Sequence, residues 1–251
     1  LDHVATSRRG RAVGRRDRVT QWPASADELI VAQHALAAAA ADPRGMGSPE
    51  PWRPAAPHPA IGAAVVIFPR GQTGAGARGD PAWAAATVLR RGTVIAEATV
   101  TGEAGGPYIP GLLALREGPC LEAAVRALAA APDVLLVDAT GADHPRRAGL
   151  ALQLGAVTGL PTIGVTHRPL LARGAWPADE RGAHAPLSLD GGHVAEWVRT
   201  RAGARPVAVH AGWRTTLEAA VEVVLSCSAR HRTPEPFRHA RKLARIARAT
   251  R

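Results

Sequence analysis

The chain has 251 residues, of which 46% are hydrophobic and 21% are charged, a balance typical of a globular domain with a full core. No apolar run approaches the roughly 20 residues that a membrane span needs, which excludes a helical membrane protein. The net charge of +10 favours a polyanionic partner, although a chain rich in Ala, Arg, Gly and Pro acquires arginines from composition alone. The two cysteines, Cys120 and Cys227, form no C-x-x-C pair, so they indicate neither a zinc site nor a disulfide framework. We expect a reduced, cytoplasmic setting.

The N-terminus is basic but has no apolar stretch after its arginines, so it is not a secretory signal. We expect residues 1–20 to be a disordered basic arm, or sequence upstream of the true start, and residues 21–251 to form a single domain. Apolar residues at helical spacing predict a helix from Ser25 to Ala41, which Asp42-Pro43 ends. The proline-rich stretch that follows, to about residue 60, is expected to be a loop.

Three short segments rich in apolar and β-branched residues come next, and they predict strands at Ile61–Phe68, Ala84–Leu89 and Thr93–Val100. The dipeptide Arg91-Gly92 predicts a hairpin turn between the last two. The first part of the chain is therefore expected to form an antiparallel meander.

The middle of the chain alternates between helix and strand. Helices are predicted at Glu117–Ala131 and Pro145–Thr158, and buried strands at Val134–Val137 and Thr162–Val165. The order strand, helix, strand predicts a βαβ unit with a parallel strand pair.

The last part predicts a strand pair at about Val194–Thr200 and Pro206–Val209, a helix at Thr216–Ser226, and a basic helix from about Glu235 to the end. Thr215 and Glu218 have the spacing of a capping box at the first of these helices. The fold class is therefore α/β, with a mixed sheet flanked by helices.

Candidate functional residues lie where the parallel strands end, because ligands of such sheets sit outside the carboxyl ends of the strands. Asp138 follows the strand Val134–Val137 and is a candidate metal ligand, although an aspartate that caps a turn or helix fits the same place. Glu117 is a second candidate, although an acid in the first turn of a helix is also favoured by the helix dipole.

The stretch Pro107-Tyr108-Ile109-Pro110-Gly111 is stiffened by two prolines and holds the only tyrosine of the chain. Such a loop could insert its ring beside a displaced base. The alternative is a proline-fixed turn whose tyrosine packs on the core.

The stretch His144-Pro145-Arg146-Arg147 is predicted to open a helix, with proline at an ordinary first position. Its histidine and arginines could then bind a phosphate at the helix N-terminus. The alternative is that the arginines form a solvated face.

Three longer motifs together resemble the endonuclease V family. They are PYIPGLLALREGP at Pro107–Pro119, LLVDATGADHPRRAGLALQLGAVTGLPTIGV at Leu135–Val165, and PEPFRHARKLA at Pro234–Ala244. They keep the order and separation of the family, and the resemblance covers about residues 20–245.

The resemblance implies a ribonuclease H-like fold and Mg²⁺-dependent hydrolysis of the second phosphodiester 3′ to deoxyinosine or a related lesion, with Mn²⁺ as a substitute metal. It assigns Glu117 and Asp138 to the metal, and Tyr108, within Pro107–Gly111, to a wedge that parts the strands. It places His144 and Arg146 beside the metal and scissile phosphate.

By the same resemblance, Gly111 and Gly141 line the lesion pocket. Arg147, from the His144–Arg147 stretch, is a further candidate for binding nucleic acid. The expected partner is DNA with deaminated bases, with inosine-containing RNA as an alternative. No membrane partner is expected, and the protein is expected to be a monomer.

Three positions depart from the family pattern. The first-strand aspartate is replaced by Ala64, a lysine by His167, and a histidine by Trp213. His167 could still act near a phosphate, and we keep it as a catalytic candidate. Ala64 cannot bind metal, so a loss of about two to four orders of magnitude in rate is expected.

Three hypotheses follow from these residues. The chain is a lesion-specific endonuclease, active or weakened; a nucleic-acid-binding relative without catalysis; or a degraded reading frame with no selected function.

Overall fold

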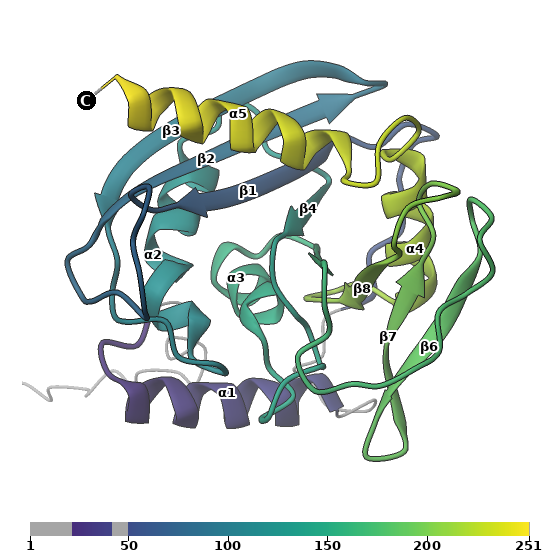
Figure 1. The fold of residues 1–251 in the computed structure, drawn as a ribbon, viewed down its shortest axis with the longest axis horizontal. Helices are drawn as coiled ribbons and strands as arrows, with labels where there is room; N and C mark the ends of the chain where they lie inside the picture. The colour runs from purple at the N-terminus through teal and green to yellow at the C-terminus, as the bar shows by residue number, and fades with distance from the viewer. Residues whose placement is uncertain (1–21, 42–49, 251) are drawn as a thin grey trace, which may run out of the picture.

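The computed structural model describes residues 22–41 and 50–250, so the predicted arm over residues 1–20 lies outside the described residues. The described chain forms one eight-stranded sheet with helices packed against it (Figure 1). The strands are β1 (Ile61–Ile67), β2 (Pro81–Arg90), β3 (Thr93–Glu103), β4 (Val134–Val137), β5 (Thr162–Thr166), β6 (His184–Leu189), β7 (Gly192–Val198) and β8 (Val207–Ala211). The helices are α1 (Ala26–Ala41), α2 (Leu113–Arg126), α3 (Leu150–Thr158), α4 (Leu217–Ser226) and α5 (Glu235–Ala249).

The strand order is β3-β2-β1-β4-β5-β8-β7-β6. Strands β1, β4 and β5 are parallel neighbours, whereas the pairs on either side of them are antiparallel. This confirms the predicted mixed sheet with its antiparallel meander and parallel pair. The carboxyl ends of β1, β4 and β5 therefore meet at one edge, where Ala64 of β1 is paired with Val137 of β4.

Successive side chains of each strand point to opposite faces of the sheet, so two cores form. One face buries Val65 and Leu136 against α4 and α5, with Phe237 of α5 fully enclosed. The other face buries Ala64 and Leu135 against α1, α2 and α3. Figure 1 shows α5, in yellow, lying across β1–β3, and α1, in purple, on the opposite side of the molecule. Full burial of a Leu or Phe side chain contributes about 1.5–3 kcal/mol, so these cores hold the helices in place.

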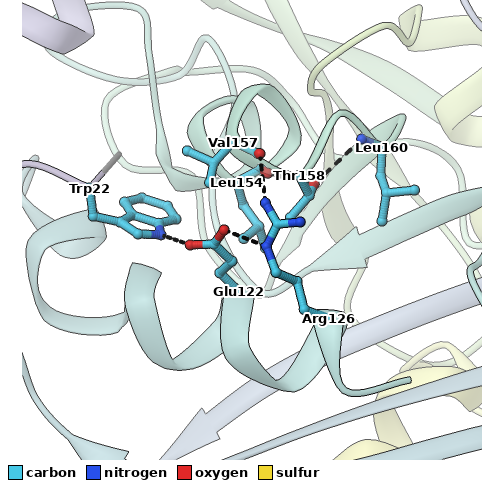
Figure 2. A network of polar contacts seen from close by, with 7 residues as sticks. All are labelled: Trp22, Glu122, Arg126, Leu154, Val157, Thr158 and Leu160. Carbon is cyan, nitrogen blue, oxygen red and sulfur yellow. Dashed lines mark hydrogen bonds and ion pairs between the residues drawn. The ribbon is translucent and has the colours of Figure 1, made fainter. Parts of the chain in front are cut away.

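A hydrogen-bonded network ties the start of the described chain to two helices (Figure 2). The Trp22 indole N–H donates to Glu122 of α2 at 2.6 Å, and the other oxygen of that carboxylate accepts from Arg126 at 2.6 Å. Arg126 also donates to the Val157 carbonyl of α3 at 3.2 Å. This network joins α2 to α3 on the face that carries the candidate site.

The Arg91-Gly92 hairpin is confirmed, because both residues have positive φ angles, 52° and 76°. That geometry is required at both central positions of a type I′ turn. The prediction of a capping box with Thr215 is wrong. The cap of α4 is Thr216, which accepts from the Ala219 N–H at 3.2 Å, whereas Thr215 donates to the Thr162 carbonyl at 2.6 Å.

Two predicted helices have wrong bounds. Helix α2 begins one turn earlier than predicted, at Leu113, and ends at Arg126. Helix α3 begins only at Leu150. The chain turns before it at Arg147, which has a φ of 55°. The Gly149 N–H then donates to the Gly141 carbonyl at 2.8 Å, outside the helix. The sequence analysis also missed strand β6, whose side chains are mostly solvent-facing.

Within residues 22–41 and 50–250, every helix falls short of the length and apolar character that crossing a bilayer requires.

Candidate active site

Two acidic side chains meet at the carboxyl edge of the parallel strands. Asp138 directly follows β4, and Glu117 projects from α2. Both line a cavity of about 210 Å³ that also contacts Ala64 and Tyr108. The predicted placement of Asp138 at this edge is therefore confirmed, and the sheet brings Glu117 to the same place.

The two carboxyl groups are close enough to influence each other. Burial raises the pKa of Glu117 to about 8, the negative charge of Asp138 adds to the rise, and Arg116 opposes it. Arg116 does not neutralise Glu117, because its guanidinium forms an ion pair with Asp80 at 3.2 Å and donates to the Gly106 carbonyl at 2.7 Å. Glu117 is therefore mostly protonated at neutral pH unless a cation approaches.

In the described part of the chain, no third acid takes the place that the resemblance gives to the family's first-strand aspartate. Ala64 is fully buried, and Asp80 is engaged by Arg116. Among the residues described by the structure, no cluster of three His, Cys, Asp or Glu side chains could share a metal ion. The carboxylate set of this site is thus Glu117 and Asp138.

Asp138 forms an ion pair with Arg241 of α5, in which the Nη2–Oδ2 distance is 2.6 Å. His167, one residue beyond β5, lies in the same neighbourhood. Partial burial and then Arg232 lower the pKa of His167, while Asp138 opposes them. His167 is therefore mainly neutral at pH 7, and the positive groups beside Asp138 are arginines.

A second cavity, of about 250 Å³, adjoins the first and shares Tyr108 and Asp138 with it. The cavity beside Glu117 and Asp138 is called the acidic cavity, and the second is called the larger cavity. The side chain of Tyr108 is 50% exposed, which rules out the alternative that it packs on the core. The wall of this cavity combines the predicted loop with polar groups from α1, α3 and the segments after β4 and β5. These polar and loop residues are Gln33, Tyr108, Ile109, Pro110, Gly111, Thr140, His144, Gln153, Thr166 and Arg168.

The Gly111 carbonyl holds the loop in place by accepting three hydrogen bonds. The donors are Gln33 at 3.0 Å, His144 at 3.0 Å and Arg146 at 2.7 Å. Gly111 has a φ of 82°, and an added Cβ would lie 3.2 Å from Arg146. This position therefore needs glycine, and Pro107–Gly111 is a positioned wall of the cavity.

His144 has both ring nitrogens engaged. Its Nδ1 accepts from the Arg146 backbone N–H at 3.1 Å, so Nε2 carries the proton that is donated to Gly111. Burial lowers the pKa of His144 to about 4. His144 is thus a neutral residue that fixes the loop, and its predicted catalytic role would require it to give up one of these bonds.

A model of the endonuclease V family matches residues 72–242. The chain belongs to the endonuclease V family. Endonuclease V of Streptomyces avermitilis is 44% identical over 170 residues, which cover 67% of this chain and 74% of the relative. Endonuclease V of Streptomyces coelicolor is 45% identical over 170 residues, 67% of this chain and 73% of the relative.

Solved endonuclease V structures share the fold. The Streptomyces avermitilis structure superposes with a TM-score of 0.77 at 36% identity and covers 92% of this chain and 96% of its own. The catalytic domain of human endonuclease V gives 0.72 at 29% identity, covering 89% and 96%. Since these relatives are endonucleases by name, the chain is an enzyme of the endonuclease V type.

Several residues that the resemblance assigned to endonuclease V chemistry have other contacts here. His144 to Arg147 do not open a helix, since α3 starts only at Leu150, so the predicted phosphate site at a helix N-terminus is wrong. Arg147 donates to Asp190 at 2.8 Å and to the Leu189 carbonyl at 3.2 Å, which ties it to the β6–β7 turn. Gly141 lines neither cavity, because its Cα packs against the Ala211 carbonyl, where a Cβ would lie at 2.1 Å.

Trp213, at the position of the family's histidine, lies away from the two carboxyl groups. It packs beside Leu36 and Leu152, and its backbone N–H donates to the Thr162 hydroxyl at 2.8 Å. It lines neither cavity. Its replacement of histidine therefore removes a polar group without placing the indole in the site.

Three residues that shape the endonuclease V site were not predicted from the sequence. Gln33 lies within the helix predicted at Ser25–Ala41, and Arg241 lies within the predicted basic helix. Asp143 is fully buried and accepts from the N–H groups of residues 170–172 at 2.6–2.8 Å, which fixes a segment that lines the larger cavity. The available signal for Asp143 was an acid directly before the predicted catalytic residue His144.

Proposed function

We propose that this enzyme recognises a deaminated base in DNA and hydrolyses a phosphodiester on its 3′ side with the help of Mg²⁺. The observation that carries the proposal is that the larger cavity and the acidic cavity adjoin and share Tyr108 and Asp138. Chemistry beside an extruded base needs a base pocket next to the hydrolytic groups. Endonuclease V of Ciona intestinalis, which has the same fold with a TM-score of 0.69 at 22% identity, was solved with DNA containing an inosine.

The larger cavity suits a base by its mixture of surfaces. Leu150 and Pro169 supply apolar area, and Gln153, Thr140 and Thr166 supply polar groups. Flipped bases are held by stacking and by hydrogen bonds to their edges. Tyr108, half exposed where the two cavities meet, is placed to occupy the gap that an extruded base leaves.

The donor set fits a magnesium ion. Mg²⁺ takes oxygen ligands and is usually held by one or two carboxylates together with waters and phosphate oxygens. Glu117 and Asp138 supply two carboxyl groups to one cavity, and their mutual repulsion contributes to the raised pKa of Glu117, which a cation would relieve. When bound, Mg²⁺ would orient the attacking water and stabilise the leaving oxygen.

The residues of this chain would act around that ion. Asp138 and Glu117 would hold the ion from two sides of the acidic cavity, and a bound cation would favour the ionised form of Glu117 over the protonated form that burial favours. The loop that ends at Gly111 keeps the base pocket in register with these acids through Gln33, His144 and Arg146. Arginines of α5 and the net charge of +10 supply attraction to the phosphate backbone.

A second function, binding of the lesion with little or no hydrolysis, is favoured by Ala64. Its side chain is fully buried at the wall of the acidic cavity, at the position where the family carries an aspartate. One of the expected carboxylates is therefore absent from the site. In the same proposal the substrate is DNA, with inosine-containing RNA as the alternative, and the protein acts as a monomer.

A nicking assay tests both functions. The substrate is a labelled duplex with one deoxyinosine, incubated with Mg²⁺ or Mn²⁺, beside the same duplex without the lesion. We expect slow, metal-dependent nicking by the unmodified protein. We expect Ala64→Asp to nick faster by about two to four orders of magnitude, because positioned acid–base groups contribute about that much. Asp138→Asn is the matched control and should abolish nicking.

The outcomes separate the hypotheses. Binding without nicking by the unmodified protein, together with nicking by Ala64→Asp, would identify a lesion-binding protein. Equal affinity for damaged and undamaged duplexes in every variant would contradict lesion recognition. A cooperative thermal melt of Ala64→Asp shows that a negative result is not caused by misfolding.

A further inference from the structure

The carboxylate that the mechanism needs is already paired with a cation of the protein. Asp138 Oδ2 accepts from Arg241 Nη2 at 2.6 Å, and the side chains of Asp138 and Arg241 are 42% and 24% exposed. A charge-assisted contact of this length belongs to the stronger class of hydrogen bonds. Arg241 is the ion-pair partner of Asp138 within the part of the chain that the structure describes.

Arg241 is held in this position by α5. Its guanidinium carbon lies 5.5 Å from the centre of the Phe237 ring, one turn earlier in the helix. Phe237 is buried in the core beneath α5, so the helix cannot move Arg241 away without losing core contacts. The pair is therefore set by the docking of α5 on the sheet, whereas the partly exposed guanidinium can still swing toward solvent.

The neighbouring arginine is fixed elsewhere. Arg232 donates to the carbonyls of Arg205 at 2.7 Å and Pro206 at 2.9 Å. It contributes positive charge near His167 but does not reach the Asp138 carboxylate. Within residues 22–41 and 50–250, Arg241 is therefore the cation that stands where a divalent metal would approach Asp138.

The loss of a carboxylate at Ala64 makes this competition more important. Without that acid, the cavity offers Glu117 and Asp138, and the charge of Arg241 offsets one of them. A guanidinium and a divalent cation repel each other at the same carboxylate, so the two compete for Asp138. Any free energy that stabilises the ion pair must be given up when a metal binds.

We propose that Arg241 is a built-in competitor of the divalent metal at Asp138, so that metal binds this carboxylate only after Arg241 has turned away. The inference rests on the proposed function, which makes Asp138 a metal ligand. Arg241 is a positioning residue in this scheme, because it acts through Asp138. Arg241 thereby lowers the affinity of the protein for divalent metal in the absence of nucleic acid.

The test is a direct measurement of Mn²⁺ binding to the full chain without nucleic acid, by electron paramagnetic resonance of free Mn²⁺. We expect Arg241→Gln to bind Mn²⁺ about fivefold more tightly than the unmodified protein, the upper range for a partly exposed ion pair. Arg241→Lys keeps the charge and should stay near the unmodified affinity. Arg245→Gln removes the same charge one turn along α5, where the side chain is exposed, and should change the affinity less than twofold.

Each result has a distinct meaning. Equal tightening by Arg241→Gln and Arg245→Gln would overturn the inference, because general charge rather than the ion pair would then be responsible. Unchanged affinity in Arg241→Gln would overturn it while leaving the proposed metal site intact. Absence of Mn²⁺ binding in all four proteins would refute the metal assignment to Asp138, and the inference with it. Thermal melts of each variant confirm that the fold is kept.

Discussion

His144 shows how burial sets the chemistry of a single residue. Its ring is 3% exposed, and its two nitrogens bind the Arg146 N–H and the Gly111 carbonyl. The neutral form is favoured because a buried charged imidazole would lose its hydration. In this neutral form His144 supports the loop Pro107–Gly111, and its catalytic role stays a prediction.

The lowered pKa of His144 predicts acid sensitivity. The pKa is about 4 in the folded protein against an ordinary value of 6.5. Its contribution to stability is therefore present above pH 6.5 and is lost as the pH falls toward 4. Between pH 7 and pH 5, the unmodified protein should lose about 1–2 kcal/mol more of its free energy of unfolding than the His144→Gln variant.

Urea titrations of both proteins at the two pH values measure this difference. His34→Gln, at an exposed position of α1, is the control and should leave the pH dependence unchanged. An identical pH dependence of His144→Gln and the unmodified protein would contradict the assigned burial effect.

Among the elements, α1 is linked to the larger cavity through one buried amide. Gln33 donates to the Gly111 carbonyl at 3.0 Å, and its own oxygen accepts from Arg146. The amide thus joins α1, the loop at 107–111 and the turn after β4. The pairing of a helix with a loop so distant in sequence explains why Gln33 escaped notice as a site residue.

We predict that Gln33→Met weakens binding to a deoxyinosine duplex by about tenfold. Methionine fills a similar volume but leaves Gly111 with one donor fewer and the Nε of Arg146 without its acceptor, and an unsatisfied buried group costs about 1–3 kcal/mol. Fluorescence anisotropy with damaged and undamaged duplexes gives the two affinities. His34→Ala, on the next residue of α1, should leave both unchanged. A loss of equal size on the undamaged duplex would argue against a role in the lesion pocket.

At the scale of the whole molecule, the charge and the pocket have separable effects. The net charge of +10 acts on every phosphate, whereas in the proposed function Tyr108 and the larger cavity would act only where a base is extruded. Affinity for any duplex should therefore fall steeply with salt, and preference for the lesion should not.

Two variants test this separation. We expect the double variant Arg238→Gln, Arg245→Gln on α5 to reduce the slope of log K against log salt by about 2, with the lesion preference kept. We expect Tyr108→Ala to keep the slope and to lose most of the preference. Titrations of both duplexes over a range of salt concentrations measure slope and preference together. An unchanged slope in the double variant would show that α5 does not face the nucleic acid.

Local features of this protein could be predicted from its amino-acid pattern. Short apolar runs predicted β1, β4, β5 and β8 because buried strands leave a strong pattern, and Arg91-Gly92 predicted its turn because few residues accept its backbone angles. The endonuclease V motifs placed Glu117 and Asp138 at one sheet edge. Strand β6 was missed because only Leu187 of its six residues is buried, so it lacks an apolar run.

Only the tertiary structure decided how these residues are paired. Three features join segments far apart in sequence. They are the Asp138–Arg241 ion pair, the three donors to the Gly111 carbonyl, and the packing of Trp213 beside Leu36 and Leu152. Such contacts depend on strand order and on how α1 and α5 dock, which periodicity does not encode. The motif predicts which side chains reach the edge of the sheet, and the packing of the helices fixes which charge stands beside each one.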